Sequence, residues 1–226
     1  MKIAVLLHGS GVYDGTEIQE AVLSLLAIEE MGHTYQCIAP DIQQFHVVNH
    51  LTGEPMSETR NVLVESARIA RGNVIKLSET DVHSFDALVM PGGFGTAKNF
   101  TTWAFDGPAG SIVEEVKDLL QSFVELKKPI VALCMSPTTL AKAFENSSYQ
   151  LELSVGSTNE ASPYDIKGIS DGIKFTGSSA QMKTVKEISI DPKNRIICAP
   201  CYMMEASLLE VRENIKQAIS ALDSLL

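Results

Sequence analysis

The sequence predicts an α/β fold, a mostly parallel sheet with helices on both faces, in one domain that spans residues 1–226. Short apolar runs such as IAVLL at 3–7 and IVALC at 130–134 are typical of strands that are buried on both faces. These runs alternate with longer stretches of helical period, which is the pattern of a parallel sheet with crossover helices. The length of 226 residues and the 45% hydrophobic content suit a sizeable core.

The first half of the chain opens as strand, turn, helix and strand. After the strand at 3–7, the segment HGSGVYDG predicts a turn, because its glycines break regular structure. Apolar residues at three- and four-residue steps then predict a helix with Thr16 as its N-cap, which stops at Gly32. The later segments of this half are a strand at 34–40, a stretch without clear period at 41–61, a helix at 60–72, and an apolar strand running into a glycine-rich loop at 85–95.

The second half contains the strongest helix of the sequence, at 112–128. It has one apolar stripe, acidic residues in its first turn and lysines at its end, and Pro129 stops it. The strand at 130–134 passes directly into MSPTTLAKAFE, which predicts a sharp strand-to-helix turn at Cys134. The remaining predicted elements are strands at 149–155, 185–191 and 195–200 and a helix at 205–226.

Charge and cysteine content exclude several classes of protein. A net charge of −10 would repel nucleic-acid phosphates and anionic lipid, and no stretch approaches the roughly 20 apolar residues of a membrane span. The apolar run at 3–7 is also shorter than the core of a signal peptide. Four cysteines are too few for a disulfide framework. We therefore expect a cytoplasmic protein that has no nucleic-acid or membrane partner.

Cys134 is the strongest candidate nucleophile. A strand-to-helix turn strains and crowds its central residue, and Ala132 and Ser136 are small enough to fit beside it. At a helix N-terminus the dipole and the free N–H groups would lower the thiol pKa. The alternative is a buried structural cysteine. The glycine loop at 90–99 would supply one N–H donor of an oxyanion hole, and the Met135 N–H the other.

Glu17 and Glu20 open the first helix at the same edge of the predicted sheet. Carboxylates at a helix start are usually solvated partners of the dipole, and Glu17 fits that description. Glu20 stands among Ile18, Ala21 and Val22, so we expect it to be drawn inward, where burial raises a carboxyl pKa and makes the group a proton shuttle.

Two other patterns are weaker. All five histidines precede Cys134, and His8, which ends the first strand, fits a loop or cap role, so a Cys-His-acid triad is not supported. Cys198 and Cys201 form a CxxC after a strand, which is open to interpretation as a redox pair or as two structural cysteines. Cys37 is expected in the core. No second ligand pair is spaced for zinc, so we expect no metal.

Several motifs in one order resemble a known family. The sequence is similar to the ElbB-type isoprenoid-biosynthesis or sigma cross-reacting proteins, which belong to the class I glutamine amidotransferase-like superfamily near the ThiJ/PfpI proteins. The similarity covers nearly the whole chain. The strings that carry it are HGSGVYDGTEIQEAV (8–22), NHLTGE (49–54), ETRNVL (58–63), PGGFGTAKN (91–99), ALCMSP (132–137) and APCYM (199–203).

The resemblance implies a flavodoxin-like three-layer sandwich, a homodimer, and the cofactor-independent glyoxalase activity of bacterial members, which converts glyoxal to glycolate. By position, Cys134 matches the family's elbow cysteine and Glu20 the acid that contacts it, while Gly93 and Met135 fall where the superfamily places its oxyanion N–H groups. True amidotransferases carry a histidine after the elbow and another near the final strand. This chain has neither, so glutaminase and peptidase activities are not expected.

The sequence therefore supports a hypothesis with two alternatives. Cys134 would add to a small reactive aldehyde, Gly93 and Met135 would hold the resulting oxygen, and Glu20 would move a proton between carbons, without cofactor or metal. A thiol-based redox or peroxide-responsive role would use Cys134 or the CxxC pair. A non-catalytic accessory role in isoprenoid metabolism would leave Cys134 inert.

Overall fold

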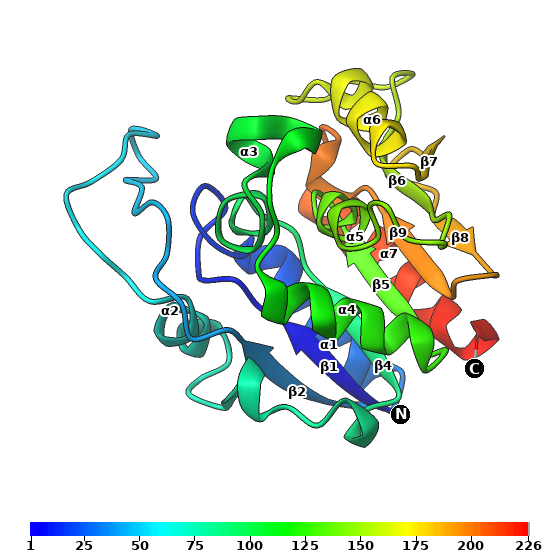
Figure 1. Cartoon of the computed structure of the whole chain (residues 1–226), viewed down its shortest axis with the longest axis horizontal. Coiled ribbons are helices and arrows are strands. Elements are labelled where there is room, and N and C mark those ends of the chain that lie inside the picture. The colour runs from blue at the N-terminus through cyan, green and yellow to red at the C-terminus, as the bar shows by residue number, and fades with distance from the viewer. Residues whose placement is uncertain (226) are drawn as a thin grey trace.

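The computed structural model describes residues 1–225 and contains a central sheet of seven strands in the order β3-β2-β1-β4-β5-β9-β8 (Figure 1). Every pairing in it is parallel except that of the edge strand β8 with β9. The mostly parallel α/β sheet predicted from the sequence is therefore confirmed. The strands are β1 (Lys2–Leu6), β2 (Thr34–Ala39), β3 (Val74–Lys76), β4 (Ala87–Met90), β5 (Ile130–Leu133), β8 (Ser189–Asp191) and β9 (Ile196–Ala199).

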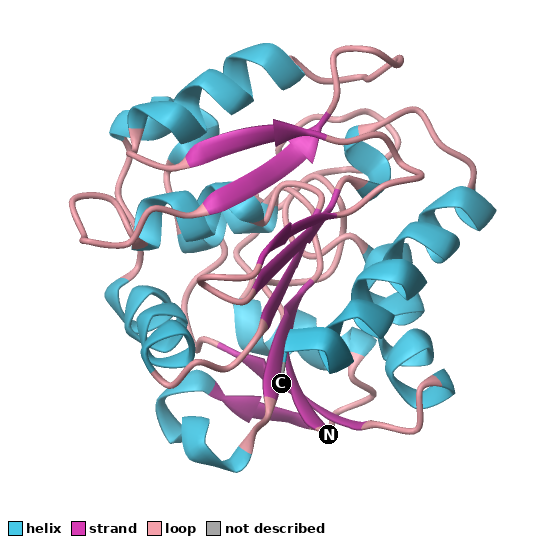
Figure 2. Cartoon of the chain, turned by 90° about the vertical axis from the view of Figure 1, so that its right-hand side faces the viewer, coloured by secondary structure: helices cyan, strands magenta, loops and turns pink. Residues whose placement is uncertain are grey.

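Helices cover both faces of this sheet, which makes the three-layer, flavodoxin-like sandwich that was predicted (Figure 2). Helix α1 (Ile18–Glu30) packs against α7 (Leu208–Ser220), and α4 (Glu114–Glu125) packs against α5 (Pro137–Ala143). In Figure 1, α4 lies in front of the sheet and α7 behind it. The shorter helices are α2 (Val62–Ile69), α3 (Trp103–Asp106) and α6 (Ile166–Phe175). Among residues 1–225, no helix has the length and apolar character needed to cross a membrane.

A second, two-stranded parallel sheet differs from the prediction. The strand expected at 149–155 is β6 (Glu152–Gly156), and it pairs with β7 (Ser179–Met182) instead of joining the central sheet. The sequence did not predict β7 or the helix α6 that connects the pair. Two glycines interrupt the helical pattern of α6, and β7 is largely exposed, so neither has a strong apolar period. The short strand β3 was missed as well.

Two helix ends also differ from the prediction. Glu17, not Thr16, caps α1, because the Thr16 hydroxyl is already occupied by the His8 N–H at 2.8 Å. The terminal helix begins at Leu208, where Ser207 and Glu210 form a capping box, and the α-helix stops at Ser220. A 3-10 turn, Ala221–Leu225, follows, and the predicted end at 226 lies outside the described residues.

The sheet brings four strand ends to one edge. Val5 pairs with Val89, Met90 with Ala132 and Leu133 with Ala199, so the segments that follow β1, β4, β5 and β9 leave the sheet side by side. Strand order reverses between β1 and β4, since β2 and β3 lie on one side of β1 and β4 on the other. Crevices at such a reversal are the usual ligand sites of open α/β sheets.

Candidate active site

Cys134 lies at the predicted strand-to-helix turn. It is the first residue after β5, its φ is +56°, and its N–H donates to the Ala199 carbonyl at 2.9 Å. A left-handed residue other than glycine costs about 1–3 kcal/mol, which the surrounding structure must offset. Ala132 and Ser136 are both fully buried beside it. The thiol-bearing residue itself is only 6% exposed, so it can meet small molecules but not a bulky substrate.

Two backbone N–H groups point at the Cys134 sulfur. They belong to Gly93 and Met135, the two residues matched to oxyanion positions from the sequence, and both hydrogen bond to the thiol group. Gly93 has a φ of +108°, and a Cβ there would lie 2.4 Å from the Glu17 nitrogen and the Gly15 carbonyl oxygen. Only glycine can therefore bring this N–H so close to the elbow. The pair can stabilise negative charge on sulfur or on an oxygen attached next to it.

Side-chain hydrogen bonds to Pro91 hold the loop that carries Gly93. The Pro91 carbonyl accepts hydrogen bonds from Ser136 Oγ at 2.7 Å and from His8 Nε2 at 3.2 Å. Burial lowers the pKa of His8 to about 4, so the ring is neutral and its Nε2 carries the donated proton. His8 thus supports the loop under the thiol and does not act as a base for it.

Glu20 is fully buried beside the elbow. Its Oε2 accepts from the Gly92 N–H at 2.8 Å, its Oε1 accepts from the Tyr202 N–H at 3.2 Å, and its carboxyl hydrogen bonds to the Cys134 side chain. Burial, reinforced by the charge of Glu17, raises the pKa of Glu20 to about 8. The carboxyl is therefore largely protonated at neutral pH, as expected for an acid that was predicted to turn inward.

The thiol pKa contradicts the sequence-based expectation. The pKa of Cys134 is raised, first by burial and second by the neighbouring Glu20 carboxyl, while the N–H groups of Gly93 and Met135 only partly offset this. The expected lowering by a helix dipole was wrong, because burial and the Glu20 carboxyl outweigh the backbone N–H groups that favour the thiolate. The two acids form one coupled pair, in which ionisation of either group disfavours ionisation of the other.

Replacement of Glu20 by glutamine is expected to change the pH dependence of stability. The folded protein keeps the Glu20 proton up to about pH 8, whereas the unfolded chain loses it near 4.5, so the unfolding free energy falls as pH rises between these values. The slope from this one group approaches −1.4 kcal/mol per pH unit. Glu20→Gln removes that contribution, which urea titrations between pH 5 and 8 would detect as a flatter profile.

The control for this measurement is Glu187→Gln. Glu187 is an exposed carboxyl whose pKa is lowered by the Thr184 N–H and hydroxyl, so its replacement leaves the downward slope in place. A Glu20→Gln profile as steep as that of the wild type would show that Glu20 is ionised in the folded protein at neutral pH.

A pocket of about 370 Å³ lies beside the site, but neither Cys134 nor Glu20 is among its lining residues. Its lining includes Glu17 and Gln19 at the start of α1, together with Tyr164 and Tyr202. Burial, and after it the charges of Cys134 and Glu20, raise the pKa of Tyr164 to about 12, so this side of the pocket stands next to the thiol. The other lining residues are Val12, Tyr13, Pro163, Met204, Glu205 and Ala206.

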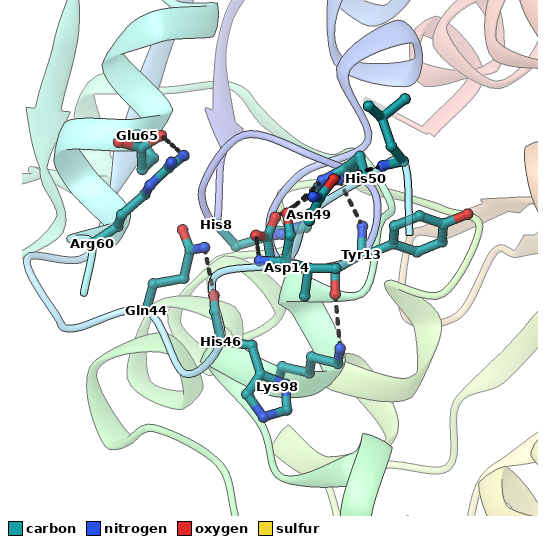
Figure 3. A network of polar contacts seen from close by, with 12 residues as sticks. His8, Tyr13, Asp14, Gln44, His46, Asn49, His50, Arg60, Glu65 and Lys98 are labelled. Atoms are coloured by element: carbon teal, nitrogen blue, oxygen red, sulfur yellow. Dashed lines mark hydrogen bonds and ion pairs between the residues drawn. The ribbon is translucent and has the colours of Figure 1, made fainter. Parts of the chain in front are cut away.

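A buried polar network fixes the glycine-rich turn that precedes α1 (Figure 3). The Asp14 carboxylate accepts the Val48 N–H at 2.6 Å and lies 3.9 Å from His50 Nε2. The Asn99 amide donates to the carbonyls of His8 and Asp14, both at 2.9 Å. Three segments distant in sequence, around residues 8–16, 41–61 and 91–99, are tied together in this way. The network explains why the segment without helical period has a defined path, and it sets the direction in which α1 presents Glu20.

The two cysteines of the CxxC have different neighbours. Cys198 lies on β9 and its sulfur contacts the Ser154 backbone, whereas Cys201 lies beyond the strand and its sulfur contacts the Cys134 N–H. Cys37 is buried in β2, as expected for a core residue. Among residues 1–225, the structure brings no three His, Cys, Asp or Glu side chains together in a way that could hold a metal ion.

The structure adds site residues that the sequence did not single out. Tyr202 donates to Glu20 through its backbone, and Asn99 orders the turn before α1. Gly92 touches both reactive groups, because a Cβ there would lie 2.3 Å from the Cys134 Cβ and 2.6 Å from Glu20 Oε2. The PGG string drew attention to this loop, but which glycine faces the thiol depends on the backbone path.

Comparisons with known proteins find relatives of this chain. Residues 1–146 match the sequence model of the DJ-1/PfpI family. The chain is 38% identical over 216 residues to the ES1 protein homolog, mitochondrial, of Rattus norvegicus, and the match covers 95% of this chain and 80% of the rat protein. It is also 38% identical to the human glutamine amidotransferase-like class 1 domain-containing protein 3, mitochondrial, over 95% of this chain and 79% of the human protein.

A solved structure is similar over the full length. The crystal structure of an isoprenoid biosynthesis protein with an amidotransferase-like domain from Ehrlichia chaffeensis superposes with a TM-score of 0.90. Its sequence is 35% identical, and the match covers 100% of this chain and 99% of that one. The likeness to the ElbB-type proteins and their amidotransferase-like superfamily is thereby confirmed.

Proposed function

The chain belongs to the DJ-1/PfpI family, and on that premise we propose that it is a cofactor-independent glyoxalase-type enzyme, which converts glyoxal to glycolate. The family and its amidotransferase-like fold are compatible with several activities. The choice among them rests on the contents of the site.

One observation carries the proposal: the Cys134 thiol contacts a buried, protonated carboxyl, that of Glu20, and also accepts hydrogen bonds from two backbone N–H groups. Cys134 supplies a nucleophile of soft, polarisable character for an aldehyde carbon. Glu20, with a pKa of about 8, can both give and take a proton near neutral pH, which is the property that a proton shuttle needs. The 6% exposure of Cys134 favours a substrate of a few heavy atoms, because little of the residue can be reached from solvent.

The proposed reaction adds water to glyoxal without net oxidation. The Cys134 sulfur bonds to one aldehyde carbon, the thiol proton passes to the new hydroxyl, and the N–H groups of Gly93 and Met135 stabilise charge on that oxygen. The ionised fraction of Glu20, which a pKa of about 8 leaves available near neutral pH, removes the hydrogen from this carbon as a proton and returns it to the other carbon. The hydroxyl proton moves to the second oxygen at the same time, which leaves a glycolyl thioester on Cys134. Water then cleaves the carbon–sulfur bond, so glycolate departs and the thiol is restored.

We do not propose glutaminase or peptidase activity, because these activities use a histidine base beside the nucleophile and the groups beside Cys134 include a carboxyl instead. The groups that act on Cys134 are Glu20, Glu17 and the two N–H donors. His8 lies under Pro91, His46 and His50 lie in the 41–61 segment, and His33 and His83 are on other surfaces of the fold. A carboxyl positions and exchanges a proton, but it does not provide the imidazole that activates the nucleophile in a triad.

Replacing Glu20 by glutamine is expected to lower kcat for glyoxal by about 10²–10⁴, the range for loss of a general acid-base group. Glutamine keeps the size of the side chain but cannot exchange the proton. Glycolate would be followed by NMR in phosphate buffer, because amine buffers condense with glyoxal.

Glu65→Gln serves as the matched control for this variant. Glu65 is another buried carboxyl, but it lies on α2 and pairs with Arg60 and Arg68, and it is not among the groups that shift the pKa of Cys134. Its turnover should stay near that of the wild type. Equal rates for Glu20→Gln and the wild type would remove the shuttle from the mechanism.

We also propose that the chain is a homodimer. Ile18, Val22 and Leu26 form an apolar row with four-residue spacing on the outer face of α1, and each side chain is more than 40% exposed. Sedimentation equilibrium that returned the mass of one chain would reject the dimer.

The names of the rat and human relatives place those proteins in mitochondria, so the cytoplasmic location remains a prediction for this chain.

A further inference from the structure

A second buried thiol stands at the candidate active site. Leu133 and Ala199 are paired across β5 and β9, and the chain leaves these neighbouring strands at Cys134 and at Pro200–Cys201. The Cys134 N–H, which donates to the Ala199 carbonyl, also contacts the Cys201 sulfur. The register of this pairing places Pro200 opposite Cys134, so Cys201 is one residue further along the neighbouring chain segment.

The backbone holds Cys201 in this place. Its φ is +48°, so both cysteines occupy left-handed positions just beyond adjacent strands. The Cys201 N–H donates to Asn214 Oδ1 at 3.0 Å, and Asn214, itself fully buried, donates to the Glu187 carbonyl at 2.9 Å. The next N–H along the chain, that of Tyr202, donates to Glu20. Cys201 is thus fixed by the same short segment that positions the acid.

We propose that Cys201 is the resolving cysteine of Cys134, so that mild oxidation closes a Cys134–Cys201 disulfide and not the Cys198–Cys201 bridge of the CxxC motif. The Cys198 sulfur contacts the Ser154 backbone, whereas the Cys201 sulfur shares the surroundings of Cys134 and Glu20. The proposal concerns a modification of the thiol and does not depend on glyoxal being the substrate.

The chemistry needs a peroxide as oxidant. The Cys134 sulfur attacks the peroxide oxygen, the O–O bond breaks, and the products are Cys134 sulfenic acid and water or an alcohol. The Cys201 sulfur then attacks the sulfenic sulfur, the S–O bond breaks, and the hydroxyl leaves as water with the Cys201 proton. The disulfide protects Cys134 from further oxidation to sulfinic acid, and a reducing dithiol restores both thiols.

The test is peptide mapping after treatment of the folded protein with hydrogen peroxide. Remaining thiols are alkylated before digestion with trypsin. Cys134 lies on the tryptic peptide 128–142, and Cys198 and Cys201 lie together on 196–212. We expect a cross-link between these two peptides in the wild type and in Cys198→Ser, reversed by dithiothreitol. Cys201→Ser should lose the cross-link and accumulate sulfinic acid at Cys134.

Several results would overturn the proposal. A disulfide closed within 196–212, with alkylated Cys134, would assign the chemistry to the CxxC. A cross-link that persists in Cys201→Ser would make Cys198 the partner. Sulfinic acid forming at Cys134 in the wild type without a cross-link would show that Cys201 cannot reach it. The comparison of wild type with Cys198→Ser does not require the Cys201 variant to fold, and Cys201→Ala is a second form of that variant.

Discussion

Cys134→Ser is expected to lower glycolate formation from glyoxal by at least about 10³-fold, because loss of a covalent nucleophile removes the entire pathway through it. A serine hydroxyl is nearly the same size as the thiol but ionises far less readily. The acid beside it cannot compensate, since Glu20 is itself largely protonated at neutral pH. Initial rates of glycolate formation, measured by NMR on equal amounts of folded protein, give the ratio.

Cys198→Ser is the control for the loss of a buried cysteine. Cys198 is fully buried on β9, and its sulfur contacts the Ser154 backbone and is not among the groups that shift the pKa of Cys134. Its turnover should remain close to that of the wild type. Full turnover by Cys134→Ser would show that Cys134 is not the nucleophile.

Gly92→Ala is expected to abolish turnover as completely as loss of the thiol, and to destabilise the fold. The added methyl group would meet the Cys134 Cβ at 2.3 Å and Glu20 Oε2 at 2.6 Å, so the thiol, the acid or the loop must move. Overpacking in a tight core costs up to roughly 3 kcal/mol. For a chain of this length that corresponds to a fall of about 6–12 °C in Tm. Calorimetry and the glycolate assay measure the two effects.

Gly53→Ala is the matched control for Gly92→Ala. Gly53 has a φ of +77°, and a Cβ there would meet no atom within 4 Å. Alanine at position 53 therefore strains the left-handed backbone but creates no steric clash, and turnover should be unchanged. A Gly92→Ala protein that kept both its Tm and its turnover would contradict the close packing of Gly92, Cys134 and Glu20.

The sequence predicted the parts of the site that depend on local pattern. The apolar run that ends at Cys134 and the small residues Ala132 and Ser136 predicted the elbow, and the apolar neighbours of Glu20 predicted its burial. The family resemblance predicted Gly93 and Met135 as N–H donors, and in the structure both N–H groups hydrogen bond to the Cys134 thiol. What each does in catalysis remains a proposal.

The features that the sequence missed depend on tertiary contacts. The pKa of the Cys134 thiol was predicted to fall because of the helix N-terminus, but burial and the neighbouring Glu20 carboxyl raise it. Cys198 and Cys201 are three residues apart and were predicted as one motif, but Cys201 has a left-handed backbone and the two sulfurs contact different neighbours, Ser154 and Cys134. Strand β7 and helix α6 were missed because exposure and glycines weaken their period.

The most direct test of the proposed function is glycolate production by the wild-type protein before and after alkylation of Cys134. Purified protein without added cofactor is mixed with glyoxal in phosphate buffer, and glycolate is followed by NMR. Peptide 128–142 reports how much of the thiol has been alkylated. The account predicts a rate proportional to protein concentration that falls in step with the unmodified fraction of Cys134. A rate no greater than that of buffer, or one that survives complete alkylation, would contradict it.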